Sequence, residues 1–149
     1  MRPSGNVWLL TAGGLSVAAA LLHLGCIVGG GPWYRALGAG EPIARAAERG
    51  AMMPHVMALI IAIVLFTWAA YAFSAAGLIA RLPLMRTALV AISAVLLFRG
   101  LGVPLMQVWR PDLSQGFIYT TAAICIAFGA IFLIGTLKAW PVLSAKGSF

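Results

Sequence analysis

The sequence predicts an all-α, polytopic membrane protein: one domain, residues 1–149, with four transmembrane helices in an up-down-up-down bundle and a short amphipathic helix in the first loop. Composition and length lead to this prediction. Hydrophobic residues make up 62% of the chain and charged residues only 9%, whereas a soluble domain carries roughly a quarter charged residues. Four apolar runs also have the roughly 20 residues needed to cross about 30 Å of hydrocarbon.

The four apolar runs cover about residues 7–29, 55–80, 84–106 and 117–139. Backbone polar groups within a bilayer must bond inside their own segment, so each run is predicted to be a helix. Short connections at 81–83 and around 108–115 make the last three runs antiparallel neighbours. In the first run Gly25 and Gly29 are spaced to let another helix backbone approach closely.

The first loop, residues 30–53, divides into two parts. Its start, GGGPWYRALGAG, is rich in glycine and predicts a turn or an irregular stretch. The next stretch, EPIARAAERG, predicts a short helix, because proline suits the first helical turn and glycine suits the stop. Glu41, Arg45 and Glu48 follow at spacings of four and three and therefore share one helix face. We expect this helix to lie on the outer membrane face or to cap the bundle.

The charges predict the orientation. The side that carries both termini holds five basic residues and no acid: Arg2, Arg81, Arg86, Lys138 and Lys146. All three acids of the chain lie on the opposite side. An excess of Lys and Arg marks cytoplasmic loops, so we expect a multi-pass protein of a bacterial-type inner membrane with both termini in the cytoplasm. The net charge of +7 does not indicate nucleic-acid binding, because the basic residues are dispersed between apolar runs.

One charged residue, Arg99, lies well inside a predicted span, about seven residues or roughly 10 Å from its outer end. His23 lies at nearly the same depth in the first span, and His55 begins the second span on the same side. A buried cation in a membrane span indicates a functional site. Together with Glu41 and Glu48 in the loop above, these residues predict an outward-facing polar pocket.

The pocket is expected to bind or transport a small anionic, amphipathic or lipid-like ligand, with Arg99 holding the anion and Glu41 or Glu48 acting as a gate. Four helices are few for a complete transport pathway, so we expect a homo-oligomer in the bilayer. The competing interpretation makes Arg99 a structural ion pair with Glu41, Glu48 or Asp112.

Other classes of protein stay open. His23 and His55 would suit a bis-histidine haem. Alternatively, His55 with Met52, Met53, Met57, Met106 and Cys26 would suit copper, since thioether, thiolate and imidazole are ligands for Cu(I). Methionine is also an ordinary flexible core residue, which weakens the copper hypothesis. A lipid- or quinone-modifying enzyme and an accessory subunit of a larger membrane complex remain alternatives, although no residue pattern specifies a reaction.

Overall fold

The computed structural model describes residues 6–144, and every element in that range is a helix. The six helices are α1 (Val7–Ala36), α2 (Glu41–Glu48), α3 (Met53–Ala75), α4 (Met85–Leu101), α5 (Val103–Trp109) and α6 (Gln115–Ser144). The prediction of an all-α fold is therefore confirmed.

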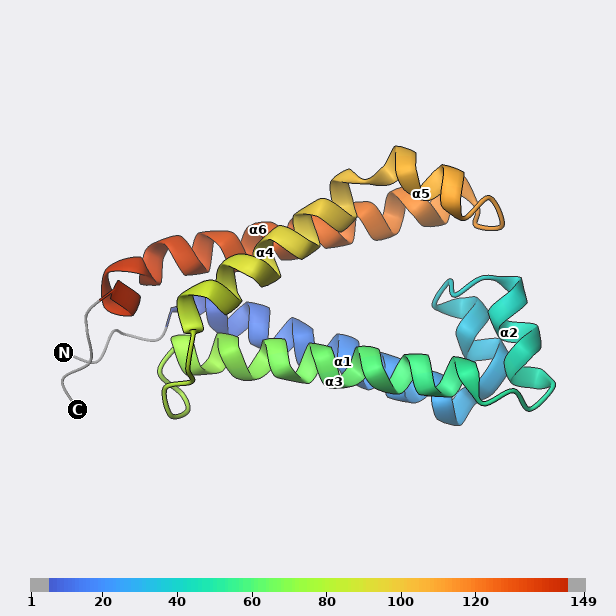
Figure 1. Ribbon diagram of the computed structural model, residues 1–149, viewed down its shortest axis with the longest axis horizontal. Helices are drawn as coiled ribbons and strands as arrows, with labels where there is room; N and C mark the ends of the chain where they lie inside the picture. Colours follow the sequence, from blue (N-terminus) through green and yellow to red (C-terminus); the bar gives the residue numbers. More distant parts are fainter. Residues whose placement is uncertain (1–5, 145–149) are drawn as a thin grey trace.

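The long helices are arranged as two pairs (Figure 1). α1 packs along α3, and α4 packs along α6, while contacts between the pairs are fewer. The two pairs meet near the start of α1 and diverge toward the end that carries α2 and α5 (Figure 1). Leu9 of α1, Leu89 of α4 and Phe132 of α6 are fully buried in one core cluster. The largest shared core therefore joins the pairs at one end, and a space remains between them toward the other.

Three helices, α1, α3 and α6, are long and apolar enough to cross a membrane. α4 has 17 residues, about 25 Å at 1.5 Å per residue, and α5 continues beyond a break at Gly102. Large apolar side chains are exposed along the outer side of α3, including Leu59, Ile60 and Ile63. A continuous exposed apolar surface of this kind marks contact with a membrane or a partner.

The first helix is longer than the sequence predicts. Gly30 has φ 64° and ψ −150°, a backbone conformation open essentially to glycine alone. The helix bends there and then continues to Ala36. Pro32 lies in the first turn after the bend, where its missing N–H costs little. The prediction of an irregular GGGPWYRALGAG stretch was therefore wrong for residues 31–36, because the glycine bends the helix without ending it.

The bend also determines what packs against Gly25 and Gly29, the two glycines that precede it. The Trp33 ring lies against the backbone of Gly25 and Gly29, where any Cβ atom would collide with it. These glycines are therefore covered by their own helix and not by the neighbouring helix that their spacing predicts.

The other boundaries follow local sequence signals. α2 begins at Glu41 with Pro42 in its first turn, and Gly50 at φ 78° follows its end, as predicted. α3 ends at Ala75, about five residues before the predicted end. The Ser74 hydroxyl donates to Ala80 O at 2.8 Å and accepts from Leu82 N at 3.0 Å. These two bonds stabilise the tight connection into α4.

Candidate functional site

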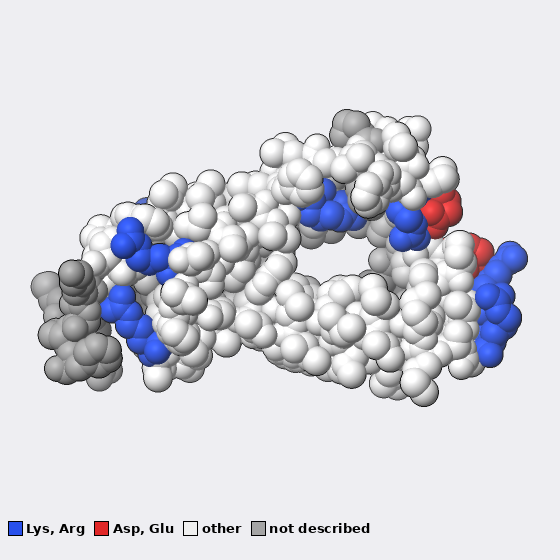
Figure 2. All heavy atoms as spheres, in the orientation of Figure 1, with Lys and Arg blue, Asp and Glu red and all other residues white. Residues whose placement is uncertain are grey.

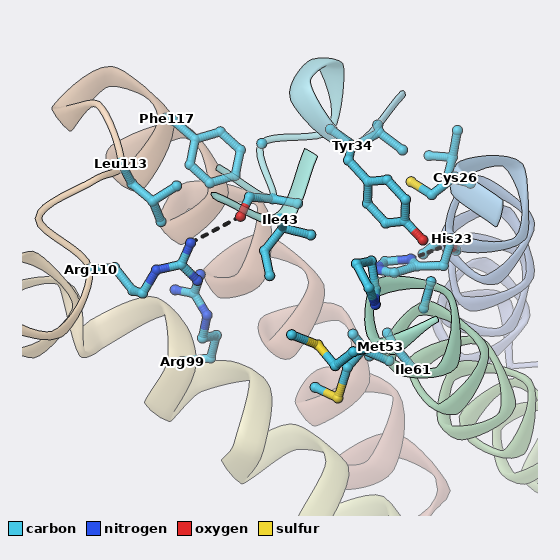
Figure 3. A pocket seen from close by; sticks show the side chains of 18 residues that line it. His23, Cys26, Tyr34, Ile43, Met53, Ile61, Arg99, Arg110, Leu113 and Phe117 are labelled. Carbon is cyan, nitrogen blue, oxygen red and sulfur yellow. Dashed lines mark hydrogen bonds between the residues drawn. The ribbon is translucent and has the colours of Figure 1, made fainter. Parts of the chain in front are cut away.

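A cavity of about 670 Å³ lies between the two helix pairs at the α2 end. Figure 2 shows it as an opening between the pairs, with basic side chains on one edge. Most of its wall is apolar and comes from α1, α3, the α1–α2 connection and the α5–α6 connection; it includes Leu22, Met57, Ile61, Leu113 and Phe117. Arg99 and Arg110 lie on one side of the cavity, and His23, Cys26 and Tyr34 lie on the other (Figure 3).

Arg99 lies in the last turn of α4 and lines the cavity. Its position is favourable for a cation because the C-terminal end of a helix carries partial negative charge. The predicted distance of seven residues to the helix end was too large, because the helix breaks at Gly102.

The Arg99 side chain is half-buried, and one of its guanidinium nitrogens is shielded from solvent. Its Nη1 atom is buried and has no hydrogen-bond partner among the residues that the structure describes. The carboxylates of Glu41, Glu48 and Asp112 instead form ion pairs with other arginines. Removing a charged group from water without pairing it costs several kcal/mol, so this nitrogen is a donor for which the described residues supply no acceptor.

His23 faces the cavity from α1 (Figure 3). Its Nδ1 atom lies 2.8 Å from Ala19 O. A carbonyl oxygen only accepts, so Nδ1 carries the hydrogen and donates. The other ring nitrogen, Nε2, is then the atom free to accept from a ligand in the neutral ring or to donate to one in the charged ring.

Arg110 bridges the two helix pairs at the edge of the cavity. Its guanidinium donates to both carboxylate oxygens of Asp112 at 2.8 Å, and its Nη2 also donates to Ala39 O at 2.9 Å. The Phe117 ring packs against Gly38, where a Cβ atom would collide with it. The α5–α6 connection is thereby fastened to the α1–α2 connection, and Arg110, unlike Arg99, has a carboxylate partner.

Glu41 and Glu48 do not line the cavity. The Arg35 guanidinium donates to both carboxylates, at 2.8 Å to Glu41 Oε2 and 3.0 Å to Glu48 Oε2, and Arg45 donates to Glu41 at 2.7 Å. The Arg35 hydrogen bonds, followed by those of Arg45, lower the pKa of Glu41 to about 2. The Arg35 guanidinium likewise lowers the pKa of Glu48. These residues fasten α2 onto the bent end of α1.

His55 is also absent from the cavity wall. Its Nδ1 atom lies 3.1 Å from the hydroxyl oxygen of Tyr34, a buried residue that does line the cavity. His55 therefore lies outside the cavity wall, contacts Tyr34 and positions its hydroxyl group.

The residues that the sequence offers as metal ligands do not all lie in the cavity. Cys26 and Met53 line the cavity, whereas Met52 is 76% exposed and lies outside it. Within residues 6–144 no group of three or more His, Cys, Asp and Glu side chains is placed to hold a metal ion.

Sequence reasoning did not identify three residues that shape the cavity: Tyr34, Arg110 and Phe117. The contact of Tyr34 with His55 depends on the bend at Gly30, which the sequence did not predict. The close spacing in Arg110-Pro111-Asp112 was the one available signal for a local ion pair.

The end of the molecule opposite the cavity carries Arg81, Arg86 and Lys138, three of the five basic residues that set the predicted orientation. Arg81 Nη2 donates to Leu143 O at 3.0 Å, and the Arg86 guanidinium lies 4.3 Å from the centre of the Trp140 ring. Arg2 and Lys146 lie outside the described residues.

Comparisons with protein-family models, curated proteins and solved structures give no match to this chain. The function proposed below therefore rests on the site itself.

Proposed function

We propose that the protein crosses a bacterial-type inner membrane four times, with α4 and its continuation α5 as the third crossing and both termini in the cytoplasm. The exposed apolar side chains along α1, α3 and α6 support contact with lipid. The positions of Arg81, Arg86 and Lys138 near the end where α1 starts support cytoplasmic termini. The cavity then opens in the half of the membrane away from the cytoplasm.

Within this arrangement the cavity binds an amphipathic anion, whose charged group contacts Arg99 and whose apolar part contacts the cavity wall. The observation that carries this proposal is the buried Nη1 of Arg99, which has no partner among the described residues and lies in a cavity with mostly apolar walls. An anion there would form charge-assisted hydrogen bonds in a medium of low dielectric constant, where such bonds are strong.

The other polar groups of the wall suit the same ligand. His23 offers Nε2 to a headgroup that reaches across the cavity. Arg110 donates hydrogen bonds to Asp112 and to Ala39 O, and so connects the two helix pairs at the edge of the cavity. Arg99 Nη1 has no such partner in the described residues and can bind the ligand.

Equilibrium binding of radiolabelled laurate to the protein in zwitterionic nanodiscs tests this proposal, with empty nanodiscs as background. Hydrogen bonds to charged groups contribute about 1.5–3 kcal/mol, so Arg99→Gln is expected to weaken binding by roughly tenfold or more. Arg49→Gln is the matched control, because Arg49 is exposed on the surface and does not line the cavity. Equal binding by wild type and Arg99→Gln would overturn the proposal.

A further inference from the structure

A second, smaller cavity of about 220 Å³ lies between α3 and α4. Its lining residues are Thr67, Trp68 and Tyr71 of α3 and Ala88, Ala91, Ile92 and Val95 of α4. Val95 precedes Arg99 by four residues, which is about one helical turn. We call this second cavity the α3–α4 groove.

The groove and the first cavity lie on the same face of α4. On α4, Ala88, Ala91, Val95 and Arg99 are separated by three or four residues and share one face. The distance from Ala88 to Arg99 along the helix is about 16 Å. The groove therefore lies along the α4 face that carries Arg99, between this residue and the α3–α4 connection.

The groove stays open because α3 and α4 each pack on another helix. α3 packs chiefly on α1 and α4 on α6, and α3 and α4 diverge from their connecting turn (Figure 1). The α4 side chains at Ala88 and Ala91 are too small to fill the space between them. The Thr67 hydroxyl donates to Ile63 O at 2.9 Å, so this donor does not need a hydrogen-bond acceptor on the ligand.

The positive charge near the groove limits the number of negative charges that the ligand's headgroup can carry. Arg110 is paired with Asp112, which leaves Arg99 as the one cavity-lining arginine that has no ion-pair partner among the described residues. One uncompensated positive charge is balanced by a single negative charge, and a second buried negative charge would be costly.

We infer that the site takes a long-chain carboxylate, a free fatty acid in its chemistry, with the carboxylate at Arg99 and the acyl chain in the α3–α4 groove. This inference rests on the proposed binding function and adds the class of ligand. The length of roughly 16 Å matches an extended, staggered chain of about 12 to 14 carbons.

Photo-crosslinking tests the position of the chain. The probe is hexadecanoate with a diazirine at the end of its chain, added to the intact protein in nanodiscs, followed by peptide mass spectrometry. We expect the label at the end of the groove nearest the α3–α4 connection, on Tyr71, Ala88 and Ala91. Arg99→Gln is expected to remove most of this label, because the carboxylate then has no anchor.

Two alanine substitutions on α4 separate the groove from the lipid-facing surface. Ala91 and Ala94 are both exposed on this helix, but only Ala91 lines the groove. Ala91→Phe should fill the groove and remove most of the label, whereas Ala94→Phe should keep it. Label spread evenly over lipid-facing helices, or label that Arg99→Gln leaves unchanged, would overturn the inference. If laurate binding still depends on Arg99 in that case, the chain placement fails and the proposed function stands.

Discussion

Two arginines line the same cavity and differ in what surrounds them. Arg110 donates to a carboxylate and a backbone carbonyl, while Arg99 Nη1 is buried without a partner in the described part of the chain. An unpaired buried charge lowers the stability of the ligand-free protein, and the protein recovers that free energy when an anion binds.

Replacing Arg99 by methionine is therefore expected to raise the stability of the ligand-free protein. Arg99→Met removes the buried charge and keeps an apolar side chain, which should raise the free energy of unfolding by about 1 kcal/mol or more. The thermal unfolding midpoint of delipidated protein in detergent measures this change, and Arg49→Met serves as the exposed control. A lower midpoint in Arg99→Met would show that Arg99 has a structural partner.

A second prediction at the residue scale concerns Glu41. Pairing with Arg35 and then Arg45 lowers its pKa from 4.5 to about 2. The pairing therefore stabilises the docked α2 fully above pH 4.5, and this contribution is lost as the pH falls through about 2. In ¹³C NMR the Glu41 carboxyl should titrate near pH 2 in wild type and closer to 4.5 in Arg35→Gln. Arg45→Gln should shift it less, and an unshifted midpoint in Arg35→Gln would contradict the assigned cause.

At the scale of elements, the bend at Gly30 brings Tyr34, Arg35 and α2 over the cavity. No atom lies within 4 Å of a Cβ added at Gly30, so a side chain there meets only backbone strain. At Gly30 itself the constraint is therefore conformational and not steric.

Gly30→Ala is expected to destabilise the protein by about 1–3 kcal/mol, because alanine does not adopt this backbone conformation without strain. Gly14 is the matched control: it lies in the same helix, has open space around it and has no positive φ. Gly14→Ala should stabilise the protein by about 0.5–1 kcal/mol. Thermal unfolding of both variants measures the effect, and equal midpoints would refute the role of the bend.

Sequence patterns predicted the elements better than their ends. Hydrophobic runs gave the four long helices, and Pro42 with Gly50 gave α2. The continuation of α1 past Gly30 was missed because glycine and proline favour helix ends locally. The break at Gly102 was missed because apolar residues continue beyond it.

At the scale of the whole molecule, the site depends on how the helix pairs are joined. They share a core at one end and meet at the other through Arg110, Ala39, Gly38 and Phe117. The sequence placed His23 and Arg99 near one end of the bundle, and both line the cavity. It could not show that Glu41 and Glu48 turn toward Arg35, because the position of Arg35 depends on the bend in α1.

Arg110→Gln is expected to loosen the contact between the helix pairs at the cavity, because the bond to Ala39 O and the ion pair are lost. Pulsed EPR between spin labels at Arg49 and Gln115, both exposed, should then show a longer or broader distance distribution.

The EPR comparison needs a background without reactive native thiols, so Cys26 and Cys125 are replaced by alanine in every sample. Arg45→Gln is the control, since Arg45 pairs with Glu41 inside α2 and should leave the distance unchanged. Identical distributions for wild type and Arg110→Gln would show that other contacts hold the pairs together.

Native mass spectrometry of protein extracted in mild detergent tests the central claim most directly, and it also reports whether the predicted homo-oligomer forms. Wild type is expected to retain an amphipathic anion that the Arg99→Gln variant does not retain, because the buried guanidinium holds the anionic group. A wild-type protein without any such ligand, or the same ligand on both proteins, would contradict the claim that Arg99 is its binding site.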